Sequence, residues 1–546
     1  MEQQPLVAYP AEFSLTTNPH LHSALESLSI DCSAEKDESL LNSSSNYYLA
    51  QVGNNFPPAL TVYDIPEEIL AHIFLTVISD VGPGNREEQP IKTTIRLSYR
   101  YLFTLSSVCS YWRRICLSRG SFWSLIPLYN EWKDPDCIMN LCLERAGGSA
   151  IHLGGALGDI VDARLLDIII KYGPRIRSLN SYGSHFDVLR NTVFSLLEHS
   201  NPGCLVSLSL HNYEITKDDH GYHHTWPLLF PTNSPEQALF NTFAESLSTL
   251  RLGGFKLNWS QTRFSELVDL KIQHLSAEGL SEIADLLAAI ASAPKLRTVL
   301  LVDIRLHAYS IQTRPLDRPG ALPVCHPSLE LLYLKDTRWS LLSHIIRSFI
   351  TGSYRTVINY TRKEYLARYP SDLTSLETSP LQGYKIDTLM ISRNWIQEHD
   401  VLRALLKAMP TIQTLYIARC EFTGGIFQAL VRPSEVILDS NETDYPIIYR
   451  LHVICATFKH TDLNRLKEVV TSHCIQELKL GGSMGESEPE QTTIMPELER
   501  FVRFEEPKDN ERTAPIRKWL KNTVPKFSLV KNIKDILDFD YLIYHL

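Results

Sequence analysis

A serine between glycines is the arrangement in this chain whose residue types and spacing most resemble a catalytic motif. Residues 481–485 read Gly-Gly-Ser-Met-Gly, which fits the pattern G-x-S-x-G, and they follow a short apolar run. In serine hydrolases such a serine lies on a sharp turn between a strand and a helix. Here an acidic, proline-containing stretch follows Ser483, and only His545 lies downstream to act as a base. We therefore interpret the segment as a flexible loop and expect no enzyme activity, with a serine hydrolase as the least favoured alternative.

Metal chemistry is suggested by a second segment and by the cysteines. Residues 218–224 contain two aspartates and three histidines. Adjacent residues rarely place their ligand atoms around one ion, so we interpret this segment as a loop. The ten cysteines form no Cys-x-x-Cys pair and no Cys/His set with zinc spacing. The sequence thus predicts no metal and no cofactor, and the cysteines fit reduced thiols in a cytoplasmic or nuclear protein.

The residues from Tyr63 to Ile126 form an apolar cluster with tryptophans, and its first segment reads as an amphipathic helix. Asp64 is placed to cap this helix, with Pro66 in its first turn and Glu67 three residues after the cap. Residues 82–84, Gly-Pro-Gly, end it. Apolar residues recur at helical spacing, at Ile65, Ile69, Leu70, Ile73, Phe74 and Val77.

Two further segments complete the cluster. The second segment has helical spacing, with Arg113 and Arg114 pointing away from its apolar stripe. The third is short and carries two adjacent aromatic residues, Phe122 and Trp123. The stripe of the second segment consists of Leu102, Leu105, Val108, Cys109, Trp112, Ile115 and Cys116.

The ordered set of three segments resembles the F-box family in its fungal, F-box-like form. The matching elements are Ile-Pro-Glu-Glu-Ile-Leu from residue 65, Leu-Ser-Ser-Val-Cys-Ser-Tyr-Trp-Arg from residue 105, and Phe-Trp-Ser from residue 122. One departure is the stretch from Ser79 to Thr94, which separates the first two helices by more than a compact F-box allows and looks like an inserted loop. A plain hydrophobic core is the alternative interpretation of these residues.

The resemblance implies a role as the substrate receptor of a Skp–cullin–F-box type ubiquitin ligase, working without bond chemistry of its own. The F-box would bind the Skp-family adaptor and through it the cullin–RING ligase, while another part of the chain binds an unknown target protein. A repeat scaffold without a ligase role is the alternative. The residues that the resemblance assigns to adaptor binding are Ile65, Pro66, Glu67, Ile69, Leu70, Ile73, Phe74, Leu105, Val108, Cys109, Trp112, Phe122 and Trp123.

Composition excludes several other classes. The apolar content of 44% and charged content of 21% are those of a globular protein. With a net charge of −9 the chain has no basic face of the kind that nucleic-acid binders present. No signal segment and no apolar run of about 18 residues occur, so we expect no membrane contact.

Short strand-like runs alternate with helical stretches from about residue 135. Most runs share one form: apolar, two mostly polar residues, apolar, any residue, apolar, as in the strand of a leucine-rich repeat. Helices are expected at residues 278–293, 339–350 and 399–409. An ordinary α/β domain with a parallel sheet is the alternative. The runs are residues 176–179, 205–210, 247–252, 267–272, 296–301, 329–334, 386–391, 412–417 and 475–480.

The predicted fold class is therefore mixed α and β: a small helical F-box-like module followed by an irregular, leucine-rich-repeat-like α/β solenoid with parallel strands. Four segments are expected. Residues 1–58 are acidic and rich in Ser and Asn, which predicts disorder. Residues 59–130 form the F-box-like module, 131–482 the repeats, and 483–546 an acidic loop with a basic and aromatic tail.

Overall fold

The computed structural model of the protein contains two compact units. The first contains residues 62–79 and 91–156 of the described chain, and the second runs from residue 157. The predicted disordered segment 1–58 lies outside the described residues. The structure describes residues 62–79, 91–128, 135–158, 162–212, 226–306, 326–350, 352–361, 381, 383–392, 399–418, 420–422, 424–433, 445–458, 463–484 and 514–530.

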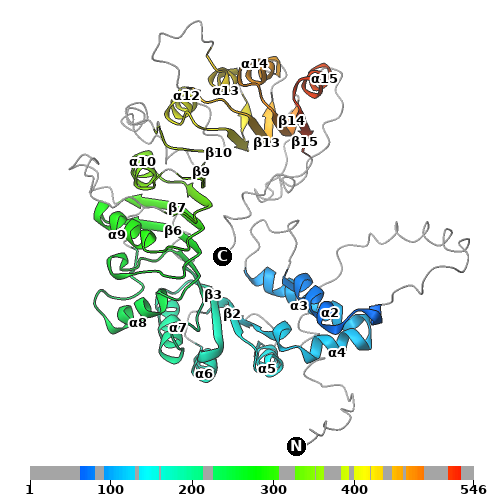
Figure 1. Ribbon diagram of the computed structural model, residues 1–546, viewed down its shortest axis with the longest axis vertical. Helices are drawn as coiled ribbons and strands as arrows, with labels where there is room; N and C mark the ends of the chain where they lie inside the picture. The colour runs from blue at the N-terminus through cyan, green and yellow to red at the C-terminus, as the bar shows by residue number, and fades with distance from the viewer. Residues whose placement is uncertain are drawn as a thin grey trace, which may run out of the picture. The chain divides into compact units, whose positions relative to one another are not determined.

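Three helices begin the first unit and pack against one another (Figure 1). A turn, η3, leads from them into strand β1, which pairs in parallel with strand β2. Helix α5 packs against both η3 and β1. The unit therefore extends beyond the expected boundary at residue 130. Its elements are α2 (Glu67–Ser79), α3 (Ile91–Val108), α4 (Ser110–Ser118), η3 (Gly120–Trp123), β1 (Leu125–Leu128), α5 (Pro135–Ala146) and β2 (Ile151–Leu157).

The start of α2 differs from the expected capping box. The carbonyl of Pro66 accepts hydrogen bonds from the amides of Ile69 and Leu70, at 3.0 and 3.1 Å, so the helix begins at Glu67. Asp64 belongs instead to a preceding turn, η1 (Val62–Asp64), three residues before the first helical residue. Sequence spacing suggested the cap, but Pro66 lacks an amide proton and fits just before the first turn equally well.

The expected inserted loop between the first two helices is shorter than predicted. Helix α3 already begins at Ile91, so residues 91–94 are helical rather than part of a loop. The buried stripe of α3 explains this start, because Ile91, Ile95, Tyr99 and Leu102 recur every three or four residues and all are buried. The segment between Ser79 and Ile91 lies outside the described residues.

The second unit is a succession of parallel strands separated mostly by helices. Each strand pairs in parallel with the next, except that β11 and the short β12 both pair with β13. Its helices are α6 (Ala163–Tyr172), α7 (Phe186–His199), α8 (Pro235–Ala244), α9 (Leu280–Ala291), α10 (Trp339–Ser348), α12 (His399–Ala408), α13 (Gly424–Leu430), α14 (Leu463–His473) and α15 (Ala514–Thr523), with the turns η4 (Gly173–Arg175) and η6 (Trp259–Gln261). Its strands are β3 (Ile176–Gly183), β4 (Ser207–Asn212), β5 (Thr249–Gly253), β6 (Asp269–Ala277), β7 (Thr298–Leu306), β8 (Leu331–Lys335), β9 (Arg355–Tyr360), β10 (Thr388–Ser392), β11 (Thr414–Ala418), β12 (Glu421–Phe422), β13 (Arg450–Phe458), β14 (Glu477–Met484) and β15 (Lys526–Leu529).

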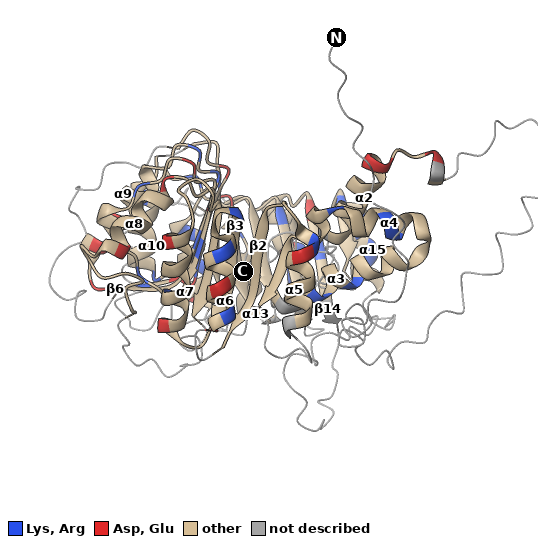
Figure 2. Ribbon diagram, turned by 90° about the horizontal axis from the view of Figure 1, so that it is seen from below, with Lys and Arg blue, Asp and Glu red and all other residues tan. Residues whose placement is uncertain are grey.

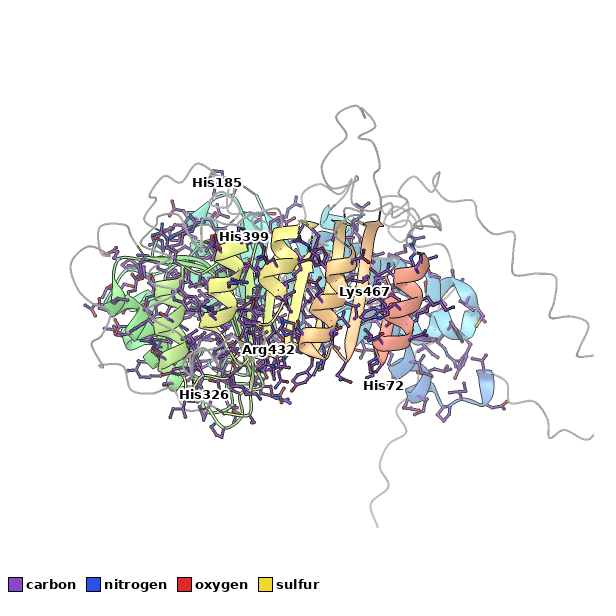
Figure 3. The ribbon with its side chains drawn as sticks, turned by 90° about the horizontal axis from the view of Figure 1, so that it is seen from above. His72, His185, His326, His399, Arg432 and Lys467 are labelled. Atoms are coloured by element: carbon purple, nitrogen blue, oxygen red, sulfur yellow. The ribbon has the colours of Figure 1, made fainter. Side chains whose placement is uncertain are left out.

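This arrangement confirms the predicted α/β solenoid-like fold with parallel strands. In Figure 3 the helices from α12 to α15, coloured yellow to red, lie in one row along one side of the strands, and neighbours in this row pack on each other. All nine expected runs form strands. In eight of them the strand begins two residues after the first apolar residue, which is itself buried; Leu205 before β4 is fully buried in this way.

Several strands were not expected from the sequence. Strand β13 follows Ile448 and β15 follows Val524, and in both places apolar residues stand at the same spacing as in the expected runs. Strand β9 lacks this spacing, because Thr356 stands where the other strands have an apolar residue. With α15 and β15, the repeating pattern continues beyond the expected boundary at residue 482.

In four successive strands, β5 to β8, a residue with a left-handed backbone follows the fifth residue of the strand. Gly254, His274, Asp303 and Asp336 have φ angles of 77°, 52°, 54° and 50°. The residues just before these four are paired with one another across the sheet. They are Gly253, Gln273, Val302 and Lys335, in strand order. Glycine, aspartate and histidine accept this conformation more readily than other residues. The same backbone bend thus recurs from repeat to repeat.

Candidate functional site

Helix α2 exposes a row of large apolar side chains. Ile69, Ile73 and Val77 stand four residues apart and are 53%, 45% and 39% exposed. The next residues along the helix, Leu70 and Phe74, are 3% and 1% exposed. Because residues four apart share one face of a helix, one apolar face of α2 is packed and the adjoining apolar face is open to solvent. We call Ile69, Ile73 and Val77 the open α2 face.

The packed side of α2 meets an aromatic core. The rings of Phe74 and Trp112 have centroids 4.6 Å apart. The indole Nε1 of Trp123 donates a 2.9 Å hydrogen bond to the Cys116 carbonyl, which satisfies a buried polar group. Phe103 contacts the Trp123 ring edge-on, with centroids 6.1 Å apart. These contacts fix the helices and so hold the open α2 face on a rigid support.

Three described cysteines of the first unit, Cys109, Cys116 and Cys142, take structural roles. Cys109 precedes α4, and its sulfur accepts a 3.5 Å hydrogen bond from the Trp112 amide. Cys142 lies 3.0 Å from the hydroxyl of Tyr99. Burial raises the pKa of the Cys116 thiol to about 11 and that of the Cys142 thiol to about 12. Protonated, buried thiols are poor nucleophiles, so both act as packing groups.

An ion pair joins the start of α2 to the turn before η3. Arg119 donates a 3.3 Å hydrogen bond to Glu67 and lies 3.8 Å from a carboxylate oxygen of Glu68. All three side chains are at least one third exposed. Solvent-exposed pairs of this kind contribute only about 0–1 kcal/mol, so Glu67 positions the helix start without dominating its stability.

The thirteen residues assigned to adaptor binding from the sequence fall into three groups. Val108, at the end of α3, is the most exposed large apolar residue described, at 57%. Buried residues are Leu70, Phe74, Phe122 and Trp123; half-buried residues are Ile65, Glu67, Leu105, Cys109 and Trp112; exposed residues are Pro66, Ile69, Ile73 and Val108.

Two exposed apolar residues of α2, Leu75 and Val77, were absent from that set. Leu75 is 37% exposed and lies on the opposite side of the buried stripe from the open α2 face. From Ile69 to Ile78 only His72 and Thr76 interrupt the apolar residues, and His72 is exposed (Figure 3). A helix that is apolar around most of its circumference needs more than one packing surface. That width, visible in the sequence, was the signal that could have identified both residues.

Comparison with known proteins identifies the kind of domain that the first unit contains. Residues 62–126 match the family described as F-box-like. No curated protein matches the chain. The chain therefore contains an F-box-like domain, and F-box domains generally bind Skp-family adaptors; F-box proteins are typically adaptors rather than enzymes.

The other motifs considered from the sequence find no support in the described residues. Ser483 lies inside β14, where its backbone is paired with Thr457 of β13, so it is not on a turn between a strand and a helix. His545 and the segment 218–224 lie outside the described residues. Within the described ranges no group of three or more His, Cys, Asp or Glu residues could hold a metal ion. Among the helices described, none has both the length and the apolar character needed to cross a bilayer.

Proposed function

We propose that this protein is the substrate receptor of a Skp–cullin–F-box type ubiquitin ligase, in which the open α2 face and Val108 bind a Skp-family adaptor. The observation that supports this most strongly is the exposure of Ile69, Ile73 and Val77 on a helix inside the F-box-like region. A soluble surface rarely leaves such side chains in a row unless a partner covers them.

The buried and exposed residues would then divide the work. Phe74 and Trp123, both nearly fully buried, hold the helices together. Ile69 and Ile73 supply the contact, since a few well-buried apolar side chains carry most of the binding energy of an interface. Of the thirteen residues assigned from the sequence, we therefore assign direct contact to the exposed group and support to the buried group.

The second unit would bind the protein to be modified. We infer that its strands and helices are degenerate leucine-rich repeats, because eight strands follow a buried apolar residue at one fixed spacing. Stacked repeats of this kind present extended surfaces for protein binding. The receptor would raise the local concentration of the target near the ligase rather than react with it.

Titration calorimetry with the full chain and a purified Skp-family adaptor tests the proposal. The double variant Ile69→Asp, Ile73→Asp places two charges in the contact and should weaken binding by more than about a hundredfold. Both residues are exposed, so the variant should keep its circular dichroism spectrum. Ile170→Asp is the matched control, because Ile170 on α6 is 54% exposed and belongs to the second unit.

Three outcomes decide between the candidates. Tight binding that is lost in the double variant and retained in Ile170→Asp supports the ligase receptor. No binding by the folded wild-type chain contradicts the receptor role and leaves a repeat scaffold as the better description. Equal losses in the double variant and the control would show that the open α2 face is not the contact.

A further inference from the structure

The sheet of the second unit has a face that none of the described helices covers. Along each strand, residues that face the helices alternate with residues that face the other way. In β6 the helix-facing residues are Leu270 and Ile272, both fully buried, and Lys271 lies between them. The pairing of neighbouring strands brings residues like Lys271 into rows across the sheet. We call the surface formed by these rows on β5 to β15 the helix-free face.

An apolar cluster occupies the middle of the helix-free face. Tyr333 of β8 and Val357 of β9 are paired and form its fully buried floor. Asn359 donates a 2.7 Å hydrogen bond to the Tyr333 hydroxyl, so the ring is held in place. The cluster consists of Leu300, Val302, Tyr333, Val357, Tyr416 and Ile454, with half-buried Leu331, Met390, Ala418 and Val530 packed against it.

Positive charge lies on both sides of this cluster. The helix-free face carries two acids, Asp269 and Glu477, against seven bases, which is an excess of five on a chain of net charge −9. Figure 2 shows blue segments along the strands as well as on the helices. The seven bases are Arg251 of β5, Lys271 of β6, Lys335 of β8, Arg355 of β9, Arg450 of β13, Lys479 of β14 and Lys526 of β15.

The two acids of the face are already engaged. Asp269 accepts a 2.6 Å hydrogen bond from Arg251. Glu477 lies 3.2 Å from Nε2 of His452 and 3.6 Å from the Lys479 amine. Asp336 lies close enough to Lys335, and Asp387 to Arg355, for their charges to interact, so these two bases are partly offset as well. Bases still outnumber acids, and the excess favours a negatively charged partner.

Lys271 shows the electrostatic consequence of this excess. Its side chain is 2% exposed, and burial together with the neighbouring Arg251 lowers the pKa of its amine to about 7, with Asp269 opposing and Lys335 reinforcing the shift. A carboxylate that binds nearby would stabilise the charged amine and raise this pKa.

We propose that the helix-free face binds an acidic peptide segment with aromatic or branched aliphatic residues at its centre, supplied by the protein that the receptor captures. This inference rests on the proposed function of the second unit. The apolar centre of the peptide contacts Leu331, Met390 and Ala418, which are half-buried and line the cluster. Carboxylates at its two ends meet Arg251 on one side, and exposed Arg450 and Lys526 on the other.

The spacing of the strands sets the length of the peptide. Seven steps between neighbouring strands separate β5, which carries Arg251, from β13, which carries Arg450, and at about 4.8 Å a step they span roughly 34 Å. An extended chain covers that distance with about ten residues at roughly 3.3 Å each. A segment of about ten residues with acids at both ends and apolar residues in the middle therefore matches the face.

Fluorescence anisotropy with the full chain and a labelled peptide tests the proposal. The probe is Asp-Glu-Asp-Phe-Leu-Leu-Phe-Asp-Glu-Asp, and a second probe replaces its four apolar residues by serine. The double variant Arg450→Glu, Lys526→Glu should bind the first probe at least tenfold more weakly than the wild type. Lys518→Glu, Lys521→Glu is the matched control, because it makes the same charge change at exposed residues of α15.

The proposal predicts saturable binding of the first probe, at least tenfold weaker binding of the serine probe, and unchanged binding in the control variant. No saturable binding, equal binding of the two probes, or equal losses in the two variants would overturn it. A chain that stops at Val530 tests one rival occupant, since residues 535–546 contain three aspartates and no Lys or Arg. An affinity for the probe that rises more than tenfold on this truncation would assign the face to that segment instead.

The peptide assay contains no adaptor, so its result is separate from the test of the ligase role. Loss of adaptor binding with intact peptide binding would contradict the proposed function only. Intact adaptor binding without peptide binding would contradict only the assignment of the helix-free face.

Discussion

Neighbouring residues of α2 have opposite environments although their side chains are chemically alike. Phe74 is almost fully buried against Trp112, whereas Ile73 is nearly half exposed. Sequence periodicity places both in one broad apolar stripe and cannot say which part of the stripe packs inside its own module. That division depends on how α2 meets α3 and α4, which the stripe alone does not determine.

The division predicts different costs for two adjacent substitutions. Phe74→Ala removes a buried ring and should lower the free energy of unfolding of the first unit by about 3–5 kcal/mol. Ile73→Ala removes a largely solvated side chain and should cost less than about 1 kcal/mol. Urea denaturation followed by tryptophan fluorescence measures both. Similar losses for the two variants would contradict the burial pattern.

At the scale of elements, the repeated strand form was the most informative signal in the sequence. It located nine strands, and eight of them follow a buried apolar residue two positions before the strand, which recurs with each repeat. The strands around Ile448 and Val524 have the same spacing and were equally predictable. Strand β9 was not, because Thr356 is buried where an apolar residue was expected and no local signal replaces it.

The site was less predictable than the fold. Helical spacing identified the apolar residues of α2, but their exposure depends on tertiary contacts with α3 and α4. The start of α2 was placed too early because Asp64 and Glu67 have the spacing of a capping box, whereas Pro66 provides the first hydrogen-bonded carbonyl. The charge of the helix-free face also escaped detection, since its bases are spread over seven strands far apart in the sequence.

Two aspartates at matched positions should respond differently to substitution. Asp303 and Asp336 follow paired residues of β7 and β8 with the same left-handed backbone, which asparagine also accepts. Although burial opposes it, hydrogen bonds from His274 and Arg305 hold the pKa of Asp303 well below its usual range. Burial instead raises the pKa of Asp336, against the opposing effects of Lys335 and Thr361.

The sign of each pKa shift sets the pH dependence. Ionised Asp303 stabilises the fold above its unfolded pKa of about 3.9, and this stabilisation is lost as the pH falls through the lower folded pKa. Asp303→Asn should therefore cost about 1–3 kcal/mol at pH 7 and less near pH 3. Asp336→Asn should show no such growth in cost with rising pH, because the folded state favours the protonated form of Asp336. Thermal unfolding from pH 3 to 7 measures the cost of both substitutions. A cost of Asp336→Asn that is larger at pH 7 than at pH 3 would contradict the raised pKa of Asp336.

On the scale of the whole molecule, six described histidines have a pKa below the ordinary value of the imidazole. Burial is the largest cause in each case, since it disfavours the charged imidazolium. His473 shows the geometry: its Nδ1 accepts a 3.2 Å hydrogen bond from the Ile448 amide, and its Nε2 lies 2.6 Å from the Leu430 carbonyl. A protonated ring could no longer accept the first bond. The histidines with lowered pKa are His152, His211, His326, His344, His452 and His473.

These shifts predict a loss of stability in mild acid. Below an unfolded pKa of about 6.5 the unfolded chain binds more protons than the folded one, so stability falls as the pH drops from 7 to 5. Each histidine contributes about 1.4 kcal/mol for every pH unit over which only its unfolded form is protonated. The thermal midpoint should fall by several degrees over this range. His452→Gln should reduce the slope of midpoint against pH, because this side chain is buried beside Lys479. A midpoint that stays constant or rises on acidification would show that the buried histidines do not control the pH response of the fold.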